Sequence, residues 1–206
     1  MKDHQRKTKD PCEICLIHKS YCICEHIPKL ELRTRVTLIV HYKELKRTTN
    51  TGRLAVHALT NSEMKVRGFE QNEASDFSDC LGAEYDTLFL FPSEDARPIT
   101  QSFIEIFKKP IHLIVPDGNW RQASKVHSRH PEFKNIQRVK VSTSSVATHF
   151  LRKEHVPEGM ATLEAIAEAL NIIEGPQVGN SLKELYQLKL NQTLRARGLR
   201  ADQIHT

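Results

Sequence analysis

The sequence has no long apolar run and no recognisable nucleotide-binding loop. None of its 206 residues lies in a stretch near the length of a membrane span, and residues 1–10 are polar and charged. We therefore expect a cytoplasmic protein. No G-x-G-x-x-G follows an apolar run and no G-x4-G-K-[ST] occurs, which disfavours nicotinamide oxidoreductases and P-loop NTPases.

Cysteine is scarce outside one short segment. Four of the five cysteines, Cys12, Cys15, Cys22 and Cys24, form the pattern C-x2-C-x6-C-x-C. In a reducing compartment such a cluster is typical of a closed tetrahedral zinc site rather than a disulfide framework. Four free thiols in a tail are the alternative, and we predict a structural zinc knuckle.

The charge is unbalanced toward the basic side. There are 30 Lys and Arg against 25 Asp and Glu, a net charge of +5, which favours a polyanionic partner. An apolar content of 39% is enough for one sizeable core. We expect a zinc knuckle at residues 1–34 and one α/β domain at residues 35–206. No obligate protein partner is evident, and the oligomeric state is open.

Short apolar runs alternate with helical patterns after the knuckle. The predicted strands are residues 35–40, 86–91, 111–115 and 138–141. The predicted helices are residues 51–59, 99–108, 119–130, 162–170 with Thr162 as N-cap, and 180–197. Residues 61–84 are polar and are expected to be irregular. The alternation predicts an α/β fold with a mostly parallel sheet flanked by helices.

Polar residues follow each predicted strand, at the sheet edge where open α/β folds bind ligands. Asp117-Gly118-Asn119-Trp120 stands where a strand gives way to a helix. A plain capped turn with Trp120 in the core is the alternative to a functional loop there. Arg121, Lys125 and Arg129 then recur every four residues, as an RNA-binding row or as a solvated face.

Several motifs occur together in an order that resembles a known family. They are the cysteine knuckle and residues 49–54, 91–96, 117–123 and 162–165. Together they resemble the DTW-domain proteins, from Cys12 to about Leu170. Asn119 departs from the pattern, because Thr usually occupies this place.

The resemblance implies a SPOUT-related fold and leaves open whether the sheet is knotted. It also implies S-adenosylmethionine as cofactor and transfer of its 3-amino-3-carboxypropyl group to a uridine of the tRNA variable loop. A SPOUT-type RNA methyltransferase shares the fold and the cofactor. A non-enzymatic zinc-knuckle RNA-binding protein also explains the charge and the cysteines, but it leaves the polar loops without a role.

Uridine N3 is a weak acid, so this reaction needs a base or a strong hydrogen-bond acceptor. Asp117 is the first candidate, with Glu44 and Glu94 as alternatives, and Trp120 is a candidate for stacking on a base or on adenine. Arg53, near a predicted helix start, is a candidate for the methionine carboxylate, or else a surface residue. Cofactor contacts are expected at Arg53, Pro92, Ser93, Glu94, Asp117, Gly118, Asn119, Thr162 and Glu164. RNA contacts are expected at Lys43, Arg121, Lys125, Arg129 and Arg152.

Overall fold

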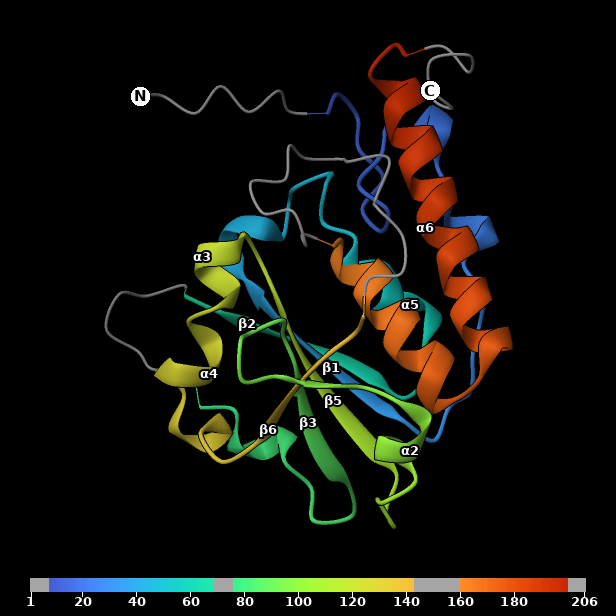
Figure 1. The fold of residues 1–206 in the computed structure, drawn as a ribbon. Coiled ribbons are helices and arrows are strands. Elements are labelled where there is room, and N and C mark those ends of the chain that lie inside the picture. The colour runs from blue at the N-terminus through green and yellow to red at the C-terminus, as the bar shows by residue number, and fades with distance from the viewer. Residues whose placement is uncertain (1–7, 69–75, 143–159, 200–206) are drawn as a thin grey trace.

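The centre of the protein is a six-stranded sheet in which every pair of strands is parallel. The structure is a computed structural model and describes residues 8–68, 76–142 and 160–199. The strand order is β2-β1-β5-β3-β6-β4 (Figure 1). The strands are β1 (Arg35–His41), β2 (Ser62–Arg67), β3 (Asp86–Leu90), β4 (Arg97–Pro98), β5 (Ile111–Asp117) and β6 (Gln137–Lys140). The predicted α/β class is confirmed, and a knot stays a prediction.

Helices cover both faces of this sheet (Figure 1). The α-helices are α1 (Gly52–Ala58), α2 (Gln101–Ile104), α3 (Trp120–Ala123), α4 (Val126–Arg129), α5 (Thr162–Ile173) and α6 (Pro176–Ala196). Short 3-10 turns are η1 (Lys19–Tyr21), η2 (Cys24–His26), η3 (Tyr42–Glu44), η4 (Ser78–Cys80) and η5 (Pro131–Phe133). Within the described ranges, no helix is both long enough and apolar enough to cross a membrane.

The two faces of the sheet carry separate cores because successive strand residues point to opposite sides. Leu38 and Val40 of β1 lie in a core shared with α1, α5 and α6, whereas Ile39 lies in a second core with α3 and α4. The first core also contains Cys15 and Ile17 of the knuckle. The knuckle therefore packs on the same face as α5 and α6.

Three expectations about elements were wrong. Residues 61–84, expected to be irregular, contain β2, an edge strand whose half-buried side chains give no apolar run. Residues 99–108 form only the four-residue α2. Residues 119–130 form two short helices, α3 and α4, with a break between them. In a continuous helix the carbonyl of Gln122 would accept from the N–H of Val126, but here it accepts from the guanidinium of Arg67.

The start of α5 also differs from the prediction. Thr162 is the first helical residue rather than the N-cap, which is Ala161. The Glu164 carboxylate accepts from the Ala161 N–H at 3.4 Å, so one free N–H of the helix start is satisfied by a side chain three residues on. The Thr162 hydroxyl is thereby left for a contact outside the helix.

Candidate active site and metal centre

Asp117 lies at the carboxyl end of β5, in the centre of the sheet. It is the last residue of that strand, is 6% exposed, and stands opposite Val40 near the end of β1. Because β5 lies between β1 and β3, the loops that follow these three strands meet at one edge. The side chain of Asp117 therefore stands at the ligand-binding edge expected for this architecture.

Two segments far along the chain meet beside Asp117. The Thr162 hydroxyl donates to Asp117 Oδ1 at 2.5 Å. The Thr51 hydroxyl accepts from the N–H of Leu163 at 3.3 Å, which joins the start of α5 to the segment before α1. The junction is tight at Gly52, since a Cβ there would lie 3.0 Å from Thr162 Cγ2 and the threonine would have to shift. The motifs at residues 49–54, 117–123 and 162–165 thus form one site.

The turn after Asp117 is fixed by a complete capping box. Asn119 Oδ1 accepts from the Gln122 N–H at 2.9 Å, and Gln122 Oε1 accepts from the Asn119 N–H at 2.8 Å. Gly118 fits because a Cβ there would lie 2.9 Å from Gln122 Oε1. An amide thus performs the capping that a Thr hydroxyl performs more weakly.

Trp120 is on the surface and not in the core. It is 42% exposed, and its ring leans on Phe91 with centroids 5.1 Å apart. One face of the indole is thus supported while much of the ring remains accessible, which is the arrangement needed to stack on a planar group.

The remaining carboxylate candidates occupy different environments. Glu44 follows β1 in η3, is 1% exposed, and forms an ion pair with Arg47 at 3.3 Å. Glu94 is exposed in the loop after β3, next to half-buried Pro92 and Ser93. Asp117 is therefore the candidate base that combines burial with a hydroxyl donor in the centre of the sheet.

The guanidinium of Arg53 is bound to backbone carbonyls. Its Nη1 donates to Leu45 O at 3.2 Å and its Nη2 to Glu13 O at 2.9 Å. Burial lowers the pKa of Arg53 and nearby cysteines act in the opposite direction. Arg53 thus bridges the knuckle to the segment after β1, and its role toward a cofactor carboxylate stays a prediction.

The basic residues predicted to contact RNA do not lie along one helix. Arg121 is on α3 and Arg129 is on α4, both exposed, and Lys125 lies at the break between them. Lys43 is exposed in η3. Arg152 lies outside the described residues.

The four cysteines of the knuckle converge as a metal site requires. Their sulfur atoms all lie within 4.8 Å of one another. The Cys12–Cys24 and Cys12–Cys22 separations are 3.5 Å, and that of Cys15 and Cys22 is 3.9 Å. Zn–S bonds of about 2.3 Å in a tetrahedron place sulfurs roughly 3.8 Å apart. The cysteines can therefore hold a metal ion, and they fit zinc.

Sequence reasoning missed residues whose partners are remote. Thr51 was noted only within a motif, and its contact with the start of α5 spans 112 positions. Lys189 has a detectable signal, because it falls on the apolar stripe of α6 with Leu182 and Leu185. Its ammonium is fully buried and donates to Cys15 O. Burial lowers the pKa of Lys189 to about 8, while Cys15 acts to raise it.

Comparisons with known proteins identify the family of this chain. The family model described as DTW domain matches residues 9–194. The chain is 25% identical to "tRNA-uridine aminocarboxypropyltransferase 2" of Macaca fascicularis over 82% of this chain and 58% of the relative. It is also 25% identical to the Mus musculus protein of the same name, over 79% of this chain and 56% of the relative.

A Drosophila melanogaster protein of that name is 23% identical over 84% of this chain and 71% of its own length. The chain thus spans somewhat more than half the length of the two mammalian relatives. Since the family model covers nearly the whole chain, from the knuckle through most of α6, the chain belongs to the DTW-domain family.

Proposed function

We propose that this protein transfers the 3-amino-3-carboxypropyl group of S-adenosylmethionine to N3 of a tRNA uridine and releases methylthioadenosine. The observation that carries the proposal is Asp117, a buried carboxylate at the carboxyl edge of the sheet, bonded to Thr162, in a DTW domain. The names of the three relatives support this reaction. A cytoplasmic location stays a prediction.

Asp117 is the general base in this proposal. It accepts the N3 proton of the uridine, and N3 then forms a bond to the γ-carbon of the methionine arm. S-adenosylmethionine, when bound, supplies that carbon on a sulfonium whose C–S bond breaks, with the electron pair passing to sulfur. The Thr162 hydroxyl fixes the orientation of the carboxylate, so that the uridine meets it in one geometry.

The cofactor lies, in this proposal, in the loops around Asp117. Pro92, Ser93 and Glu94 follow β3, and Gly118 and Asn119 follow β5. Thr162 and Glu164 begin α5 on the facing side. Burial raises the pKa of Glu164, and its bond to the Ala161 N–H opposes that rise. Glu164 therefore helps to fix the start of α5, whose first residue contacts Asp117.

The tRNA approaches, in this proposal, over α3 and α4. Trp120 offers an exposed ring beside the site, and Arg121, Lys125 and Arg129 continue from it as phosphate contacts. Lys43 extends the basic surface on the side of β1. Trp120 and Arg121 follow directly after β5, and Lys125 and Arg129 continue over the face of the sheet that α3 and α4 cover. In this proposal, a uridine extruded from the RNA reaches Asp117 beside Trp120.

Identification of the small-molecule product tests the proposal. The purified protein is incubated with unmodified tRNA and S-adenosylmethionine, and the mixture is analysed by mass spectrometry with a reaction lacking tRNA as control. Methylthioadenosine with the matching mass gain on a uridine is the expected result. S-adenosylhomocysteine with a methylated nucleoside would assign the protein to the methyltransferases instead, and tRNA binding without either product would make it a binding module.

A further inference from the structure

Two buried or half-buried cations lie directly behind the four cysteines. Lys189 of α6 is fully buried, and its ammonium donates to the carbonyl oxygen of Cys15. Arg53 of α1 donates to the carbonyl oxygen of Glu13, one residue after Cys12. Both cations therefore touch the backbone of the first cysteine turn, from two different helices.

Among the described residues, neither Lys189 nor Arg53 forms an ion pair with a carboxylate. Both side chains instead reach the backbone of the turn that carries Cys12 and Cys15, beside four converging sulfur atoms. Four thiolates around one divalent ion carry a net charge of about −2, which two cations balance. A buried cation without such a partner is costly.

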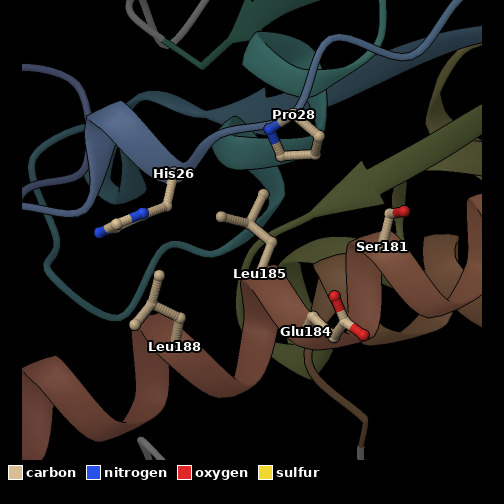
Figure 2. A pocket seen from close by; sticks show the side chains of 6 residues that line it. All are labelled: His26, Pro28, Ser181, Glu184, Leu185 and Leu188. Carbon is tan, nitrogen blue, oxygen red and sulfur yellow. The ribbon is translucent and has the colours of Figure 1, made fainter.

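Apolar packing between the knuckle and α6 is incomplete. A cavity of about 320 Å³ separates the segment after the last cysteine from α6, and it is lined by His26, Pro28, Ser181, Glu184, Leu185 and Leu188. Figure 2 shows the leucines of α6 pointing toward His26 and Pro28. Lys189 and Arg53 therefore add polar bonds to the apolar contacts that attach the knuckle.

Arg53 also contacts the segment beside the candidate active site. Its Nη1 donates to Leu45 O at 3.2 Å, and its own N–H is accepted by Asn50 Oδ1 at 3.2 Å. This segment ends at Thr51, which holds the N–H of Leu163. A continuous set of bonds therefore runs from the first cysteine turn through Arg53 to the start of α5.

We propose that Arg53 and Lys189 are the counter-cations of a metal–thiolate centre, and that Arg53 couples metal binding to the segment at residues 45–51. Arg53 suits this role because its planar guanidinium donates to two carbonyls at once. Metal occupancy then sets the conformation of one wall of the candidate active site. The proposal concerns the metal centre and holds whichever group the enzyme transfers.

Zinc affinity tests the first half of the proposal. The zinc-loaded protein is titrated with a chromogenic chelator, for wild type and for Lys189→Met and Arg53→Gln, with Lys183→Gln on the same helix as control. Loss of an outer-shell partner typically weakens metal binding by about 10- to 100-fold. We expect this loss in the first two variants and wild-type affinity in the control. Unchanged affinity in Arg53→Gln, which tests the idea even if Lys189→Met does not fold, would overturn it.

Hydrogen exchange tests the coupling. The amides of Leu45, Arg47 and Asn50 are hydrogen-bonded within their own segment and should exchange faster when zinc is chelated. Arg53→Lys keeps the positive charge but loses the planar guanidinium that binds two carbonyls. Zinc affinity should therefore stay within about threefold of wild type, while the exchange rates of these amides should no longer depend on zinc. Equal exchange with and without zinc in the wild-type protein would refute the coupling.

Discussion

The metal centre and the carboxyl edge of the sheet draw their residues from very different distances along the chain. The four sulfur ligands all come from residues 12–24, whereas the bond from Thr162 to Asp117 spans 45 positions. A short pattern therefore specifies the metal centre, but only the folded sheet assembles the edge. This difference predicts that perturbing the metal centre changes stability first, and that perturbing the edge changes chemistry or binding first.

Removal of the metal should have the largest effect. If zinc is present at 1,000 times its dissociation constant, its loss lowers the free energy of unfolding by about 4 kcal/mol. Thermal unfolding with and without a chelator measures this effect, and Cys22→Ser should abolish the response to chelator. A melting temperature indifferent to chelation in the wild-type protein would contradict a structural metal.

His112 should make stability depend on pH without affecting the chemistry. It is fully buried in β5, and its Nε2 lies 2.8 Å from the Thr37 hydroxyl, which itself donates to Glu63. The Thr37 hydroxyl therefore accepts from Nε2–H of the ring, and burial disfavours a second proton on Nδ1. Burial lowers the pKa of His112 to about 4, and Arg35 acts in the same direction.

The sign of this effect follows from proton linkage. The pKa of this histidine is about 6.5 in the unfolded chain, so between pH 6.5 and pH 4 only the unfolded chain binds the proton. The contribution of His112 to the free energy of unfolding is therefore complete above pH 6.5. It falls by about 3 kcal/mol in total as the pH is lowered to 4. Urea unfolding at pH 7.5 and pH 5 should show a smaller difference for His112→Gln than for wild type. An identical difference in both proteins would show that another group titrates.

Trp120 should matter for RNA and little for folding. Because it is 42% exposed, Trp120→Ala should leave the melting temperature nearly unchanged but weaken tRNA binding by about 1–3 kcal/mol, the usual value of a stacked base. Fluorescence anisotropy with labelled tRNA measures this loss. Ile106→Ala, at an apolar side chain that is 60% exposed, is the matched control. Equal binding by both variants would argue against stacking.

A single basic residue should have the smallest effect. Arg129→Gln removes one proposed phosphate contact, so tRNA binding should weaken about fivefold at 0.15 M salt and the salt slope should fall by about 0.9. Lys108→Gln, which is exposed next to the amino edge of the sheet, should change neither. Equal tRNA binding by the two variants would contradict a phosphate contact at α4.

The same contrast explains what could be predicted from the sequence. β1 and β5 were predictable because their apolar runs are continuous, and the metal site because its spacing is local. The break between α3 and α4 was not, since it depends on Arg67, 55 positions from Gln122. Asp117 was singled out by its place after a strand, but its hydroxyl donor belongs to the start of another helix.

The most direct test compares Asp117→Asn with Asp86→Asn, at the opposite edge of the same sheet. Each variant is loaded with zinc, its melting temperature is measured, and methylthioadenosine formation is followed with unmodified tRNA. We expect wild-type zinc content and a folded protein in both variants, with turnover lowered by about 10²- to 10⁴-fold only in Asp117→Asn. Near wild-type turnover in Asp117→Asn would contradict the placement of the chemistry at this edge.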